Sequence, residues 1–171
     1  MTTFAFISTI LSAVVLFGFI ALGIVKFGWQ KSYSTYAHLW KAKIPIRSMC
    51  FWSLPTALAA ILFAPGALER GASNPAQFLG FFISVYLILV ACTPDYLTNE
   101  KQRKVHVFGA MACAAVNVLW IIFACHLWWL PLVTLVLVWC GAYWSNTLGK
   151  ADILWLEIAM FASAYAAVFI G

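Results

Sequence analysis

Long runs of apolar residues, separated by short polar segments, occupy almost the whole chain. The runs cover residues 4–25, 48–68, 76–94, 105–148 and 153–170. A helix that crosses about 30 Å of hydrocarbon needs roughly 20 mostly apolar residues, and most of the runs have about that length. They are apolar on every face and about twice as long as the strands of a membrane barrel, so they predict transmembrane helices.

The run 105–148 contains no Lys, Arg, Asp or Glu and is long enough for two helices. We place the break at residues 125–129, with Pro131 in the first turn of the next helix, where proline is tolerated. Six spans are therefore expected, at 4–25, 48–68, 76–94, 105–124, 128–145 and 153–170. Five spans are the alternative, if residues 105–148 hold one span and a re-entrant segment.

Composition supports an all-α membrane protein with a single transmembrane domain, residues 1–171. Hydrophobic residues make up 65% of the chain and charged residues 9%, whereas a soluble domain has about 25% charged residues. These values exclude a water-soluble enzyme, and they are the opposite of a disordered composition. The first run lacks the basic start of a signal peptide, so we expect it to be a retained helix.

Basic residues predict the orientation in the membrane, because Lys and Arg collect on the cytosolic side. With six spans, one set of loops carries only Arg70. The other set carries Lys26, Lys31, Lys41, Lys43, Arg47, Lys101, Arg103, Lys104 and Lys150. Both termini are therefore expected outside the cytosol. The net charge of +5 then indicates contact with anionic headgroups of the bilayer and not with nucleic acid.

The first cytosolic connection has the pattern of an amphipathic helix, residues 29–43. Trp29, Tyr33, Tyr36 and Trp40 recur at intervals of three or four residues and fall on one helical face, with basic and polar residues between them. Such a helix lies in the headgroup layer, where the four aromatic rings would contact lipid. An interfacial anchor is the simpler interpretation, and a lipid-sensing or gating element is the alternative.

Glu157 is the candidate site residue, because it is the only formal charge well inside an apolar run. An ionised carboxylate in hydrocarbon costs several kcal/mol, so it must be protonated, paired or in contact with water. The functional interpretation is an ion-binding, proton-relay or metal-binding carboxylate. The structural interpretation is a pair with His106 or Lys150, or a side chain that reaches back to the interface.

Three more ionisable residues are expected at the same cytosolic depth. Asp95 follows the third span, His106 begins the fourth and Asp152 precedes the sixth. A short loop joins the third and fourth spans, which could bring Asp95 close to His106. Asp95 and His106 also have structural interpretations. An acid after proline often binds local backbone amides, and a histidine in the first turn of a helix can simply be solvated. Asn117, midway along the fourth span, could line a path or form a hydrogen bond between helices, which is commoner.

Neither a cofactor nor a metal site can be assigned from the motifs. The chain has no HExxH, no CxxC and no Gly-x-Ser-x-Gly. The cysteines are expected to be packing residues. Small residues four positions apart, at Gly109 and Cys113 and again at Ala159 and Ser163, predict that the fourth and sixth helices approach other helices closely.

Three function classes fit these observations. The first is a channel or transporter for an ion or small solute, which would be a homo-oligomer because six helices leave little room for a large cavity. The second is a membrane enzyme that acts on lipid at the cytosolic leaflet, with the acids and His106 as its site. The third is a structural or effector subunit that needs a partner membrane protein. The transport class is placed first, because Glu157 within a span needs a hydrated or paired environment.

Overall fold

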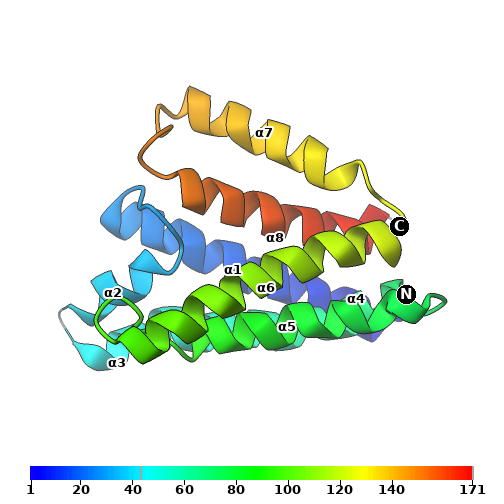
Figure 1. The fold of residues 1–171 in the computed structure, drawn as a ribbon, viewed down its shortest axis with the longest axis horizontal. Coiled ribbons are helices and arrows are strands. Elements are labelled where there is room, and N and C mark those ends of the chain that lie inside the picture. Colours follow the sequence, from blue (N-terminus) through cyan, green and yellow to red (C-terminus); the bar gives the residue numbers. More distant parts are fainter. Residues whose placement is uncertain (43, 171) are drawn as a thin grey trace.

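The computed structural model describes residues 1–42 and 44–170, and all regular elements in these residues are helices. Figure 1 labels the α-helices in chain order. Their bounds are α1 Thr3–Phe27, α2 Thr35–Lys41, α3 Pro45–Ser48, α4 Leu54–Arg70, α5 Phe78–Ala91, α6 Glu100–Phe123, α7 Leu130–Trp144 and α8 Asp152–Ile170. A π-helical turn, Met49–Ser53, joins α3 to α4, and a 3₁₀ turn, Pro75–Gln77, precedes α5.

The long helices run back and forth, so that both termini lie at one end of the bundle and α2 and α3 at the other (Figure 1). At the end that carries the termini, the backbone N–H of Thr2 donates to Glu69 Oε2 at 2.6 Å. Within the described residues, four helical segments are long and apolar enough to cross a membrane: Thr3–Phe27, Pro45–Arg70, Glu100–Phe123 and Asp152–Ile170. The chain is therefore an all-helical protein with the features of an integral membrane protein.

Two expected spans form shorter helices. α5 has 14 residues and α7 has 15, about 21 and 23 Å at 1.5 Å per residue, which is less than the hydrocarbon thickness. α5 ends at Ala91 because Thr93 precedes Pro94, and proline disfavours helical geometry in the residue before it. α7 ends at Trp144, where Asn146 adopts a left-handed conformation with φ 54°. Residues 76–94 and 128–145 are thus only partly helical.

The run 105–148 divides into two helices near the expected place. α6 ends at Phe123, α7 begins at Leu130, and Pro131 lies in the first turn of α7. The turn is closed by a hydrogen bond of 3.0 Å from Leu127 N to Ile121 O. α6 and α7 are therefore separate helices that run in opposite directions.

The second apolar segment starts earlier than expected, at Pro45, and contains a π turn before Pro55. Proline has no N–H to donate and its ring crowds the preceding turn, so the wider π turn accommodates it. The hydroxyl of Thr56 donates to the carbonyl of Trp52 at 2.5 Å. Trp52, within this π turn, is fully buried.

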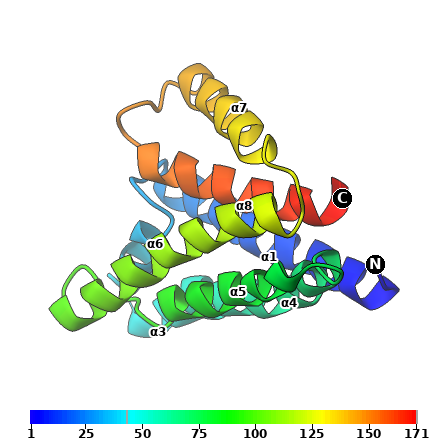
Figure 2. The same cartoon turned by 45° about the vertical axis from the view of Figure 1, so that its right-hand side comes forward.

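The core lies mainly between α1, α4, α5, α6 and α8, and α2 and the first residue of α7, Leu130, add buried side chains to it. Leu16, Trp120 and Leu154 are at most 1% exposed. α7 packs along α8 and stands apart from the other helices in Figure 2. The small residues of α6 lie mainly on α5, since Cys113 Sγ donates to Ile83 O at 3.6 Å and a Cβ at Gly109 would lie 3.3 Å from a backbone oxygen of α5.

Candidate functional site

The start of α8 is held by the connection between α1 and α2. Gly28, with φ 71°, ends α1 and turns the chain back. The carbonyl of Lys31 then accepts a hydrogen bond of 2.9 Å from Leu154 N, one of the free N–H groups of the first turn of α8. Trp29 stacks on Trp155 with ring centroids 4.7 Å apart. Residues 28–34, called the docking segment below, therefore lie against the first turns of α8.

Glu157 meets this segment one turn further along α8. Its Oε2 accepts a hydrogen bond of 2.6 Å from the backbone N–H of Tyr33. The side chain is half-buried and forms no ion pair within residues 1–42 and 44–170. The pairs with His106 or Lys150 that the sequence allowed are therefore not formed. The carboxylate keeps acceptor capacity beyond the bond from Tyr33, because an ionised carboxylate has about four acceptor positions.

The carboxylate lines a cleft of about 350 Å³ between α6 and α8, which α5 and the docking segment close on the other sides. Its wall is almost entirely apolar, and Glu157 is the only formal charge among the described residues that form it. The lining residues are Tyr33, Ser34, Leu87, Val90, Ala110, Met111, Cys113, Ala114, Ile153, Leu156, Glu157, Met160 and Phe161. The polar end, with Tyr33, Ser34 and Glu157, can hold a positively charged or hydrogen-bond-donating group.

A second, much smaller cavity follows the cleft along α8. It has a volume of about 20 Å³, enough for a single water molecule, and Leu87 and Phe161 line both spaces. Ser84 Oγ lies in its wall and is buried without a hydrogen-bond partner among the described residues. Tyr165, also in the wall, donates its hydroxyl to Ser12 Oγ at 2.6 Å, and Ser12 in turn donates to Ala59 O. Phe161 and Leu87 thus separate a large outer space from a small inner one.

His106 is buried away from the carboxylates. Its Nδ1 lies 2.9 Å from the hydroxyl of Thr93, and its ring stacks on Tyr96 at 4.0 Å between centroids. The imidazole is 4% exposed and also lies 6.2 Å from the ring of Trp52. These contacts tie the start of α6 to the end of α5 and to the π turn.

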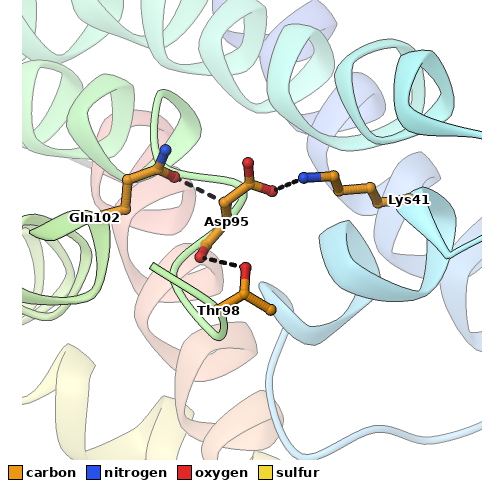
Figure 3. Close-up of polar contacts among 4 residues, drawn as sticks. All are labelled: Lys41, Asp95, Thr98 and Gln102. Atoms are coloured by element: carbon orange, nitrogen blue, oxygen red, sulfur yellow. Dashed lines mark hydrogen bonds and ion pairs between the residues drawn. The ribbon is translucent and has the colours of Figure 1, made fainter. Parts of the chain in front are cut away.

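Asp95 is held by the neighbouring loop and by α2 (Figure 3). Its carboxylate pairs with Lys41 at 2.5 Å, and its backbone N–H donates to Gln102 Oε1 at 2.9 Å. Its carbonyl accepts from the hydroxyl of Thr98 at 3.3 Å. Asp95 and His106 are therefore close in sequence but bind different partners, and Asp95 connects α2 to the loop between α5 and α6.

Asp152 and Asn117 have structural contacts. Asp152 accepts a hydrogen bond of 2.8 Å from Gly149 N, in the loop that enters α8, and lines a separate apolar hollow between α7 and α8. Asn117 is 1% exposed, and its Nδ2 donates to the carbonyl of Met160 at 3.0 Å. Asn117 therefore makes the hydrogen bond between helices that was the commoner expectation, while its Oδ1 has no partner among the described residues.

The aromatic stripe of residues 29–43 packs on the protein. Only Thr35–Lys41 is α-helical, and residue 43 lies outside the described residues. Tyr33, Tyr36 and Trp40 are 3%, 1% and 9% exposed, and Trp29 lies on Trp155, so the four rings expected to contact lipid face the bundle. The predicted helix 29–43 is therefore shortened to α2, with Trp29 and Tyr33 in the segment before it, and the periodicity of the four rings reflects burial against protein and not against lipid.

The candidate residues therefore do not assemble into one cluster. Glu157, His106, Asp95 and Asp152 each have a different partner, and within the described residues no three His, Cys, Asp or Glu side chains could hold a metal ion. Sequence reasoning missed the backbone N–H of Tyr33 and the ring of Phe161. The spacing of Glu157, Phe161 and Tyr165, four residues apart, was the available sign that one face of α8 lines both spaces.

Comparison with models of known protein families, with curated proteins and with solved structures finds no match for this chain.

Proposed function

We propose that this chain is a small multi-pass membrane transport protein that binds a positively charged ion or solute in the α6–α8 cleft, with Glu157 as the binding carboxylate. The observation that carries the proposal is the half-buried Glu157, which is hydrogen-bonded to Tyr33 N but is not ion-paired among the described residues. A carboxylate in apolar surroundings is stabilised by protonation, by water or by a compensating charge, and a bound cation would supply the last of these.

The two spaces along α8 support transport more than simple binding. The cleft and the inner cavity are consecutive and share the side chains of Phe161 and Leu87. Rotation of a ring such as Phe161 would join them and extend the path towards Ser84 and Tyr165. A lipid-modifying enzyme is less well supported, because Asp95, His106, Asp152 and Glu157 bind separate partners instead of sharing one substrate position.

The proposed topology has six spans, with α5 and α7 as the short ones, and both termini outside the cytosol. The described basic residues other than Arg70 belong to the end of the bundle that carries α2 and α3 (Figure 1). That end would face the cytosol and its anionic lipid headgroups. α2 would lie at this interface, with the exposed His38 outward and Trp40 inward. Homo-oligomerisation, or a partner membrane protein, stays a prediction.

The test is cation flux into proteoliposomes. We expect the wild-type protein to carry at least one of three probes, protons, potassium or choline, faster than empty liposomes. Glu157→Gln should abolish that flux, and Glu100→Gln, which alters an exposed glutamate paired only with Lys104, should leave it unchanged. Absence of flux for all three probes, with folded and inserted protein, would contradict the proposal, and equal flux in Glu157→Gln would remove Glu157 from the path.

A further inference from the structure

The cleft between α6 and α8 opens sideways, through a rim of apolar residues. Met111 on α6 and Ile153 and Leu156 on α8 line the cleft and are 69%, 43% and 55% exposed. In a membrane-spanning arrangement, apolar side chains of this exposure face the hydrocarbon. The mouth of the cleft would therefore admit a molecule that is dissolved in the bilayer, without passage through water.

The two ends of the cleft differ in chemistry. Tyr33, Ser34 and Glu157 form the end near the start of α8, and the remaining wall is aliphatic, aromatic or sulfur-containing. Met111 and Met160 are flexible and polarisable, so they adapt to an apolar chain of variable shape. The volume of about 350 Å³ lies within the range of roughly 300–1,000 Å³ that holds ligand-sized molecules.

Charge decides which head group fits. No Lys, Arg or His lines the cleft among the described residues, whereas Glu157 offers a carboxylate at its polar end. An anionic head would be repelled by Glu157, and a zwitterionic phospholipid would bring its phosphate into a space without a basic side chain. A positively charged amine satisfies the carboxylate through a charge-assisted hydrogen bond.

We infer that the cleft binds an amphiphile from the bilayer that carries a positively charged amine head, an apolar tail and no anionic group. The ammonium lies against Glu157 and the tail runs between α6 and α8 past Ala110 and Ala114. This inference rests on the proposed function, since it names the substrate class of the same site. The ligand would enter from the bilayer and not from water, because the rim of the cleft is apolar.

Binding to the purified protein in phosphatidylcholine nanodiscs tests the inference. The probes are dodecylamine, dodecanol and dodecanoate, which share one chain length and differ in head-group charge, and the water-soluble butylamine. Native mass spectrometry and the shift of the unfolding temperature report binding, because a ligand of the native state raises that temperature. We expect dodecylamine to bind at least tenfold more tightly than each of the other three probes.

Substitutions at the polar end and in the apolar wall of the cleft locate the ligand, and Glu100→Gln is the control. Glu157→Gln should lower the affinity for dodecylamine at least tenfold, while Glu100→Gln should bind as wild type. Ala114→Phe should lower it by filling the cleft; where that variant fails to fold, Ala110→Val serves the same purpose. Wild-type affinity in Glu157→Gln, or equal binding of dodecanoate, would overturn the inference.

The remaining outcomes separate the inference from the proposed function. Equal binding of butylamine and dodecylamine would overturn the bilayer source, because the tail would then contribute nothing. Flux of a small cation without dodecylamine binding would overturn the inference and leave the transport proposal standing. Dodecylamine binding that depends on Glu157, without flux of any probe in proteoliposomes, would support the inferred ligand and contradict transport of small cations.

Discussion

The backbone N–H of Tyr33 donates a hydrogen bond of 2.6 Å to Oε2 of Glu157, across 124 positions of the chain. This bond gives Glu157 a structural task in addition to the proposed binding task. The carboxylate both holds the docking segment on α8 and faces the cleft, so substitutions of Glu157 must be chosen to separate the two roles.

Glu157→Gln and Glu157→Leu provide that separation. Glutamine keeps a side-chain oxygen that accepts from Tyr33 N, whereas leucine leaves this N–H without a partner. We expect Glu157→Leu to be less stable than Glu157→Gln by about 1–3 kcal/mol, the typical cost of an unsatisfied buried donor. Denaturant unfolding in detergent micelles measures the difference. Equal stability of the two variants would mean that the bond to Tyr33 does not hold the docking segment.

The hydroxyl of Tyr33 makes a second bond, to Thr56 Oγ1 at 2.8 Å, which connects the docking segment to α4. Burial raises the pKa of Tyr33 above its ordinary value, so the phenol stays protonated and the bond persists across neutral and mildly alkaline pH. We expect Tyr33→Phe to lower the free energy of unfolding by about 1 kcal/mol, to the same extent at pH 7 and pH 9. Tyr143→Phe, at an exposed ring on α7, is the control and should change little.

The α1–α4 crossing depends on Gly66. A Cβ at this position would collide with the side chain of Thr9, and it would lie 3.2 Å from Val168. We expect Gly66→Ala to destabilise the protein by about 1–3 kcal/mol, the usual cost of overpacking. Gly18→Ala is the matched control, because nothing lies within 4 Å of the new methyl group, and it should be neutral or stabilising.

The double variant Gly66→Ala with Thr9→Ala should recover part of the loss of stability, because it removes the nearest colliding group. Thermal unfolding of the wild type, Gly66→Ala, Gly18→Ala and the double variant in one detergent measures these effects. A destabilisation that is equal for Gly66→Ala and Gly18→Ala would show that close approach at Gly66 is unimportant.

Phe161 separates the cleft from the inner cavity, and its truncation should join them. We expect Phe161→Ala to destabilise the protein by about 3–5 kcal/mol, because the ring is 7% exposed in the core. Under the transport proposal it should also raise passive cation leak in proteoliposomes. Phe78→Ala, at a ring that is 55% exposed on α5, should leave the leak at the wild-type level. A folded Phe161→Ala protein without increased leak would exclude Phe161 as the barrier.

The orientation can be tested with single cysteines in a variant without the five native ones. Thr98→Cys lies in the loop between α5 and α6, expected in the cytosol, and Ala72→Cys lies in the loop after α4, expected outside; both positions are exposed. In intact cells, a membrane-impermeant maleimide should label Ala72→Cys and spare Thr98→Cys until the cells are opened. The reverse labelling would invert the proposed topology.

The sequence pattern predicted the helical class and most of the helix positions. An apolar run long enough to span a membrane is compatible with few structures other than a helix. The break before Pro131 was predicted from proline chemistry and is found where α7 begins. The short α5 was not predicted, since hydropathy continues past Ala91 although Pro94 ends the helix. Hydropathy measures the apolar length of a run, whereas backbone geometry sets the length of a helix.

The site could be predicted only in part. Glu157 stood out as a charge in an apolar run, but its partner is a backbone N–H, which leaves no trace in residue identities. Asp95 and His106 were expected to converge because one short loop joins their helices. Asp95 instead pairs with Lys41, and His106 forms a hydrogen bond with Thr93. The direction of a side chain decides such contacts, and sequence spacing does not show it.

The position of the docking segment has a consequence for biosynthesis. Residues 28–34 leave the ribosome early, but their contacts from Trp29, Lys31 and Tyr33 are made with α8, which is synthesised after every other helix described here. The bond of Tyr33 to Thr56 can form once α4 is in place, whereas the contacts with α8 form only after the intervening helices have been synthesised. Contacts so distant in sequence form late, so the indole of Trp29 lacks its stacking partner until α8 is in place.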